Sequence, residues 1–249
     1  MEIRLVRHAT LVVRLGGKTL LVDPMLSPPG AMSPSPDTPN DSRNPLVPLP
    51  DLDLAPIDAV LVTHTHPDHF DAAAAERLPE GLPILCQPED EEHLRSSGFP
   101  DVRPIMESLM WESIEFRRTG GRHGTGEIGA AMAPVSGFVL HTPDEPTLYI
   151  AGDTIWCPEV EDALTEYQPQ VTVVNAGAAR FVTGDPITMS DTNVAEVCHH
   201  APETTVVAVH MEAINHCLLS RDDLQAFLDG EYLSQRVRIP ADGERMDFS

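Results

Sequence analysis

The sequence predicts an α/β fold in which helices cover sheets. Short apolar segments of four or five residues alternate with helix-favouring segments along most of the chain, which is typical of helices packed on a sheet. The chain has 249 residues, of which 41% are hydrophobic, and no glycine- and serine-rich linker divides it. We therefore expect residues 1–249 to form a single domain.

The first half opens with an antiparallel meander. The apolar segments 3–6, 11–15 and 19–22 predict strands, and Gly16-Gly17 predicts a two-residue hairpin turn. Residues 23–56 are rich in proline and lack apolar periodicity, which predicts a long loop because proline interrupts both helices and sheets. Such a loop is typical of either a mobile insertion or a functional lid, and the sequence leaves both open.

Strands and helices alternate along the rest of the chain. The apolar segment 59–62 predicts a buried strand, and the alanine-rich segment 71–78 predicts a helix. The other predicted strands are 82–86, 113–117, 137–140, 147–150, 171–174, 205–209 and 237–239. The other predicted helices are 89–97, one beginning near Pro158, 191–199 and 219–228. The order of meander and helices occurs twice, which indicates two similar halves.

A cluster of metal-capable side chains directly follows the predicted strand 59–62. Its members are His64, His66, Asp68 and His69. Imidazoles this close would repel one another if charged and would waste hydrogen-bonding capacity if packed in a core. A bound cation removes both problems. Imidazole nitrogen suits zinc or iron, and the carboxylate extends the choice to manganese.

Further candidate ligands come later in the chain. His123 lies in the glycine-rich segment 120–126, whose backbone can approach a ligand closely. Asp153 follows the strand 147–150, where a carboxylate can either cap the next helix or bridge two cations.

The last candidate ligand is His210, which ends the strand 205–209. His216 lies nearby as an alternative, and we favour His210 because sites in α/β proteins form at the carboxyl ends of strands.

The net charge of the chain argues against polyanionic partners. Asp and Glu outnumber Lys and Arg by 39 to 16, which gives a formal charge of −23. Such a surface repels phosphate backbones and anionic lipids, so we expect a small-molecule substrate and neither nucleic acid nor a membrane. A homo-oligomer remains open.

Two features of the sequence predict the cellular compartment of the protein: the character of its first residues and apolar runs, and the spacing of its cysteines. The first residues, Met1 to Val6, are typical of a strand and lack the features expected of a signal peptide, and no apolar run approaches the roughly 20 residues that a membrane span needs. Its cysteines are far apart, which favours reduced thiols over a disulfide framework. We therefore expect a cytoplasmic protein.

The motif His64-x-His66-x-Asp68-His69, followed by His123, Gly152-Asp153 and His210, resembles the metallo-β-lactamase superfamily. The resemblance implies a four-layer αβ/βα sandwich with two divalent metal ions at one edge. It further implies that His64, His66 and His123 bind one ion, that Asp68, His69 and His210 bind the other, and that Asp153 bridges them.

Within that superfamily, three segments are most similar to the branch of L-ascorbate-6-phosphate lactonases and related hydrolases. They are Gly152-Asp153-Thr154, residues 174–177 and residues 209–212. This resemblance implies a metal-dependent hydrolase of a small lactone or ester.

The chemistry expected of such a site is hydrolysis by a metal-bound hydroxide, because divalent cations lower the pKa of bound water from 15.7 to about 7. We expect Asp68 to be the catalytic residue that orients the water or relays its proton. We expect both ions to be zinc, with manganese or iron as alternatives. A small phosphodiester hydrolase on the same site and a non-catalytic metal-binding protein or sensor are the other hypotheses.

Candidate substrate-binding residues follow the strand 171–174. They are Asn175, Arg180 and Thr188. Arg180 can bind a substrate carboxylate or phosphate, or else pair with one of the many surface acids.

Overall fold

Two seven-stranded sheets form the centre of the computed structural model, which describes residues 1–249. The first sheet has the order β14-β1-β2-β3-β4-β5-β6. Its strands are β1 (Glu2–Arg7), β2 (Thr10–Leu15), β3 (Lys18–Val22), β4 (Ala59–Val62), β5 (Ile84–Cys86), β6 (Val102–Pro104) and β14 (Arg245–Asp247).

The second sheet has the order β13-β12-β11-β10-β9-β8-β7. Its strands are β7 (Ser108–Trp111), β8 (Ile114–Thr119), β9 (Gly137–His141), β10 (Leu148–Ile150), β11 (Val171–Asn175), β12 (Thr205–Val209) and β13 (Val237–Arg238). In both sheets the early strands pair antiparallel and the strands that follow pair parallel, and the last strand, β14, pairs antiparallel with β1. The expected two similar halves are therefore present.

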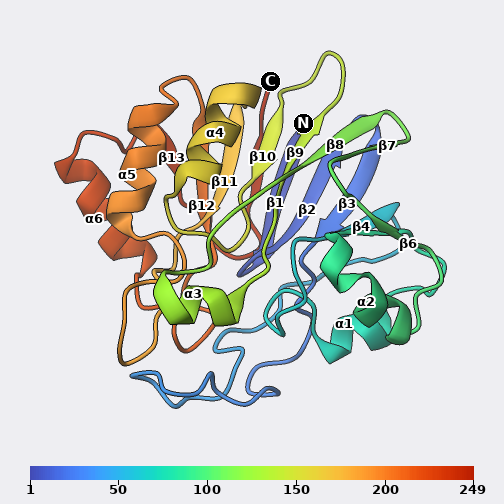
Figure 1. Ribbon diagram of the computed structural model, residues 1–249, viewed down its shortest axis with the longest axis horizontal. Coiled ribbons are helices and arrows are strands. Elements are labelled where there is room, and N and C mark those ends of the chain that lie inside the picture. The colour runs from blue at the N-terminus through green and yellow to red at the C-terminus, as the bar shows by residue number, and fades with distance from the viewer.

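Helices cover the outer face of each sheet (Figure 1). Those on the first sheet are α1 (Ala72–Arg77) and α2 (Glu91–Ser96), preceded by the short 3₁₀ helix η1 (Pro88–Asp90); those on the second are α4 (Pro158–Tyr167), α5 (Asp191–His200) and α6 (Arg221–Gly230). One apolar cluster fills the space between the sheets, and one further cluster lies between each sheet and its helices. The layers therefore form the predicted αβ/βα sandwich.

Local sequence explains where these elements form. All of Ala-Val-Leu-Val in β4 is buried, as expected for a parallel strand covered on both faces. Three helices begin at a residue whose side chain accepts a hydrogen bond from the backbone N–H three residues later: Asp71 for α1, Ser190 for α5 and Ser220 for α6. None of the helices combines the length and apolarity of a membrane span.

Four elements were not predicted from the sequence: β6, β7, β14 and α3 (Gly126–Met132). The three strands are short and lie at or next to a sheet edge, so they carry little apolar pattern. Helix α3 begins inside the glycine-rich segment and buries none of its residues. Glycine disfavours helices, so local propensity predicts a loop there.

The proline-rich loop has no helix or strand between Pro24 and Asp58, as predicted. The fully buried Arg7 anchors it, because its guanidinium donates hydrogen bonds to the carbonyl oxygens of Met25, Ser27 and Val47. In Figure 1 the loop runs beneath the sheets, on the side away from the chain termini.

Asn215 holds the far part of the same loop. Its amide donates to the Thr38 hydroxyl at 2.7 Å and to the Ser35 carbonyl at 3.2 Å, while its Oδ1 accepts from the amide of Asn44 at 2.8 Å. Since Asn215 is 1% exposed, these bonds are shielded from water and fix the loop against the segment that follows β12.

Replacing Asn215 with alanine is expected to loosen this loop. The change leaves buried partners unsatisfied, at a cost of about 1–3 kcal/mol each. We expect faster backbone hydrogen exchange and faster proteolysis within residues 30–44. Asn40→Ala is the matched control, because that half-buried side chain only accepts a hydrogen bond from the backbone N–H of Ser42 two residues away. Equal protection in the two variants would contradict the anchoring role of Asn215.

Candidate metal centre

The predicted ligands come together at one edge of the two sheets. The loop between β4 and α1 carries four of them, and the others follow β8, β10 and β12. Three groups have ligand atoms within 4.8 Å of one another: His8, Asp68, His69 and His210; His64, His66 and His123; and His64, His69 and Asp153. Every residue of the predicted ligand set belongs to at least one group.

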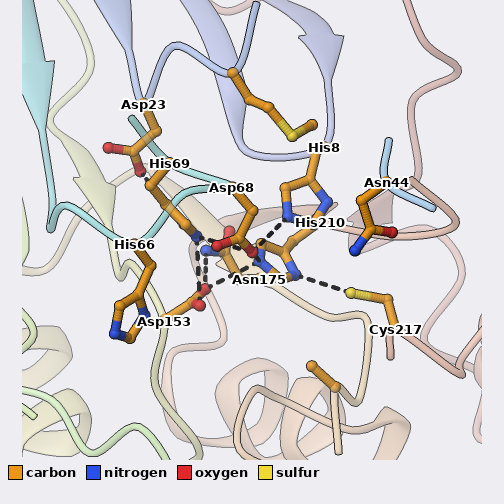
Figure 2. A network of polar contacts seen from close by, with 12 residues as sticks. His8, Asp23, Asn44, His66, Asp68, His69, Asp153, Asn175, His210 and Cys217 are labelled. Carbon is orange, nitrogen blue, oxygen red and sulfur yellow. Dashed lines mark hydrogen bonds and ion pairs between the residues drawn. The ribbon is translucent and has the colours of Figure 1, made fainter. Parts of the chain in front are cut away.

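Asp153 lies at the centre of the cluster and is 2% exposed. Its Oδ2 is 3.3 Å from the Nε2 atoms of both His69 and His123 and 3.8 Å from that of His64. Its Oδ1 lies 3.3 Å from His210 Nε2. Because its two oxygens face different histidines, this carboxylate has the placement that bridging requires (Figure 2).

Two ring nitrogens show that the cluster fits a cation. The Nε2 atoms of His69 and His210 are buried and have no hydrogen-bond partner, although both face carboxylate oxygens. A nitrogen lone pair facing a carboxylate is repulsive, and it becomes favourable when a cation lies between the two. The mixed imidazole and carboxylate donors suit zinc and other first-row metals.

The carboxylates also shift the pKa values of the rings. Burial opposes the charge on His69, but Asp153, Asp23 and Asp68 outweigh it and raise its pKa to about 10. Burial likewise opposes the charge on His210, and Asp153 raises its pKa well above the ordinary value. Burial dominates at His64 and lowers its pKa. Protons on His69 and His210 thus balance the carboxylates where no cation does so.

Outer contacts fix the orientation of the rings. Asp23 Oδ2 accepts a hydrogen bond from His69 Nδ1 at 2.8 Å and another from the Thr63 hydroxyl at 2.7 Å. The Nδ1 atom of His123 donates to the carbonyl of Ile187 at 2.8 Å. Such partners hold a ligating histidine in one tautomer and one orientation.

Replacing Asp23 with asparagine is expected to weaken metal binding or activity by about 10–100-fold, the usual effect of losing the carboxylate behind a ligating histidine. The change keeps the shape of the side chain but leaves one acceptor oxygen in place of two, so asparagine cannot accept from both the Thr63 backbone N–H and His69 Nδ1. Metal titration of the purified variant measures the effect. The control is Asp53→Asn, because Asp53 is an exposed acid in the same half of the chain. Equal metal affinities of the two variants would show that Asp23 only supports the backbone.

Two residues of the cluster, His8 and Asp23, were missed from the sequence. Each lies just after the end of a strand, β1 and β3 respectively, and both are buried. The signal that identified Asp153 and His210, a polar residue directly after an apolar strand, was present at both positions. Neither residue lies in a recognisable ligand motif, so this signal alone does not single them out.

The predicted substrate-binding residues have different surroundings. Asn175 is buried and donates to Asp153 Oδ1 at 2.6 Å, so it orients the central carboxylate. The Thr188 hydroxyl accepts a hydrogen bond from the backbone N–H of Ala179. Arg180 is exposed, and its guanidinium forms no hydrogen bond or ion pair. The pairing of Arg180 with a surface acid is therefore absent.

His216, the alternative last ligand, belongs to none of the candidate metal groups. Its Nδ1 lies 3.0 Å from the Ser35 hydroxyl, and its ring stacks on Phe181. His210 is the residue whose Nε2 faces both Asp68 and Asp153.

The glycine-rich segment packs against its own chain. A Cβ atom at Gly121 would lie 3.1 Å from Thr154, and one at Gly124 would lie 2.8 Å from Ile187. These glycines therefore permit the close packing that brings His123 to Asp153.

A four-layer sandwich with a His/Asp cluster at its edge is the arrangement of the metallo-β-lactamase fold. A family model described as the β-lactamase superfamily domain matches residues 18–211. The chain therefore belongs to this superfamily.

Curated relatives place the chain in the UPF0173 family within this superfamily. The UPF0173 protein YddR of Bacillus subtilis is 39% identical over 254 residues, which cover 100% of both chains. A UPF0173 metal-dependent hydrolase of Pyrobaculum aerophilum is 30% identical and covers 72% of each chain.

Solved structures are similar over the whole chain. A possible metal-dependent hydrolase of Veillonella parvula has a TM-score of 0.95 at 37% identity, covering 99% of this chain and 98% of that one. An isothiocyanate hydrolase from Delia radicum gut bacteria has a TM-score of 0.94 at 36% identity, covering 100% and 99%. The protein is a metal-dependent hydrolase.

Proposed function

We propose that the protein hydrolyses a small molecule at an electrophilic carbon and that isothiocyanates are its substrate class. The observation that carries this proposal is the 36% identity to an isothiocyanate hydrolase over the full length of both chains. The buried His/Asp cluster supplies the donors that metal-assisted attack by water needs. The proposal treats residues 1–249 as one catalytic unit.

The cluster would hold two divalent cations. His64, His66 and His123 are the donors for one, and Asp68, His69 and His210 are the donors for the other, with Asp153 shared. Zinc suits a set in which imidazoles predominate, and manganese or iron also tolerates these ligands. When bound, such cations polarise the substrate and lower the pKa of water towards about 7.

Asp68 is the residue of this set that can exchange protons with the reaction. Its side chain is 15% exposed, whereas that of Asp153 is 3% exposed. In isothiocyanate hydrolysis, the oxygen of water bonds to the central carbon, the double bond between that carbon and the nitrogen breaks, and the nitrogen keeps its bond to the substituent. Both protons of the water end on the nitrogen, so the products are an amine and carbonyl sulfide. Asp68 would carry a proton from oxygen to nitrogen.

A lactone or other ester is the second candidate substrate. It is supported by the similarity of residues 152–154, 174–177 and 209–212 to L-ascorbate-6-phosphate lactonases. The exposed and unpaired Arg180 would bind a carboxylate or phosphate on such a substrate. The charge of −23 disfavours nucleic acid and anionic lipid surfaces for either candidate.

The test is a substrate panel with three arms: isothiocyanates, lactones and esters, and small phosphodiesters. Each arm uses chelated protein and protein with restored zinc, manganese or iron. We expect metal-dependent turnover in the isothiocyanate arm. Turnover confined to lactones and esters would replace the first candidate by the second. Fully loaded protein without turnover in any arm would indicate a non-catalytic metal-binding protein.

Replacing Asp68 with asparagine tests the proton relay in the same assay. We expect kcat to fall about 10²–10⁴-fold, with bound metal measured alongside so that ligand loss is recognised. Glu76→Gln, an exposed acid on the nearby α1, is the control. Unchanged turnover in Asp68→Asn would remove Asp68 from the mechanism.

A further inference from the structure

His8 is a buried histidine beside the cluster that neither the ligand motif nor the proposed reaction uses. It follows β1 directly and is 0% exposed. Its φ of 59° lies in the left-handed region, which costs a non-glycine residue free energy. Backbone strain of this kind persists where the surrounding structure fixes the residue, commonly at a functional site.

One ring nitrogen of His8 points into the cluster (Figure 2). His8 Nε2 lies 3.2 Å from Asp68 Oδ2. The backbone N–H of His210 donates to the carbonyl oxygen of His8 at 2.9 Å, and the two ring centroids are 3.6 Å apart. His8 is therefore held in place by His210 and directed at Asp68.

The surroundings of the other ring nitrogen, Nδ1, distinguish His8 from the histidines of the proposed ligand set. The Nδ1 atoms of His69, His123 and His210 lie within hydrogen-bond distance of Asp23, the Ile187 carbonyl and Cys217 respectively. His8 Nδ1 is buried and has no partner. A histidine that binds metal through Nε2 carries its proton on Nδ1 and donates it to an acceptor.

Because no acceptor faces His8 Nδ1, the proton of this ring belongs on Nε2, where Asp68 Oδ2 accepts it. A nitrogen that carries this proton has no lone pair for a cation. His8 therefore lies inside the cluster and outside the ligand set.

We propose that His8 is a positioning residue, whose Nε2–H donates to Asp68 Oδ2 and fixes the carboxylate for proton transfer. The bond holds the side chain in one orientation, in which Oδ2 also faces the Nε2 atoms of His69 and His210, and Oδ1 takes up the transferred proton. The catalytic consequence rests on the proposed function, whereas the tautomer and the ligand set do not.

The test compares His8→Leu with His8→Gln. Leucine fills the buried space without a donor, and glutamine places an amide N–H near the position of Nε2. Both variants bear the same left-handed backbone, so any folding cost is matched. We expect both to keep the full metal content of the native protein. The expected kcat of His8→Leu is about 10–100-fold lower with KM nearly unchanged, and glutamine recovers most of the loss.

The second measurement is the ¹⁵N spectrum of the imidazoles in zinc-loaded native protein. We expect His8 as the neutral tautomer with its proton on Nε2. A proton on Nδ1, or loss of one metal equivalent in both variants, would make His8 a ligand and overturn the proposal. Full kcat in His8→Leu would also overturn it. If native protein turns over no substrate, the proposed function fails, while the spectrum and the metal content still decide the placement of His8.

Discussion

Replacing Asp153 with asparagine is expected to reduce kcat/KM at least about 10³-fold and to lower the occupancy of both cation positions. The carboxylate faces His69 and His123 through one oxygen and His210 through the other, so in the proposed ligand set it would serve both cation positions. Losing several kcal/mol of stabilisation of developing charge corresponds to a rate loss of this size. Asparagine keeps the volume of the side chain and removes its charge.

Elemental analysis and steady-state kinetics on the same preparation measure the effect. Asp162→Asn, an exposed acid on α4, is the control for the lost charge. Full metal content with full activity in Asp153→Asn would place the bridging position elsewhere. A loss of only the metal held by one ligand group would show that Asp153 serves that group alone.

Loading ion-free protein with metal is expected to release about two protons, one each from His69 and His210. The pKa of His69 is about 10 and that of His210 lies well above its ordinary value, so both rings are protonated near neutral pH before a cation binds. A cation must displace these protons. Affinity should therefore rise as pH increases from about 6 to about 9, by about tenfold per unit for each proton displaced.

Calorimetric titration in buffers of different ionisation enthalpy counts the protons. Chelated protein should show no hydrolysis and a lower melting temperature, because a ligand that binds only the native state at 100 times its Kd stabilises it by about 2.7 kcal/mol. Affinity independent of pH would mean that the rings are already neutral in the ion-free protein.

Much of this site could be predicted because its residues obey a local rule. A polar residue at the end of an apolar strand reaches the sheet edge, and His64, Asp153 and His210 all follow such strands. The fold class was predictable for the same reason, since strands buried on both faces are continuously apolar. These signals need only a few neighbouring residues.

What the sequence did not reveal depends on distant contacts. Asn175 lies at a strand end, as a substrate residue would, yet its amide bonds Asp153 from 22 residues away. Thr188 carries a hydroxyl that satisfies a backbone N–H at Ala179. His8 is 60 residues from its partner Asp68. Residue type and position alone do not reveal which neighbour a polar group will bind.

The left-handed backbone at His8, Asp23 and His210 has a consequence for how metal enters. Their φ values are 59°, 44° and 66°, and all three residues are nearly or fully buried. The packing of the folded chain stabilises these three strained conformations, so they do not depend on a bound cation. We therefore expect each of the two proposed cations to be taken up in one kinetic phase, whose rate is set by water loss and proton release rather than by chain motion.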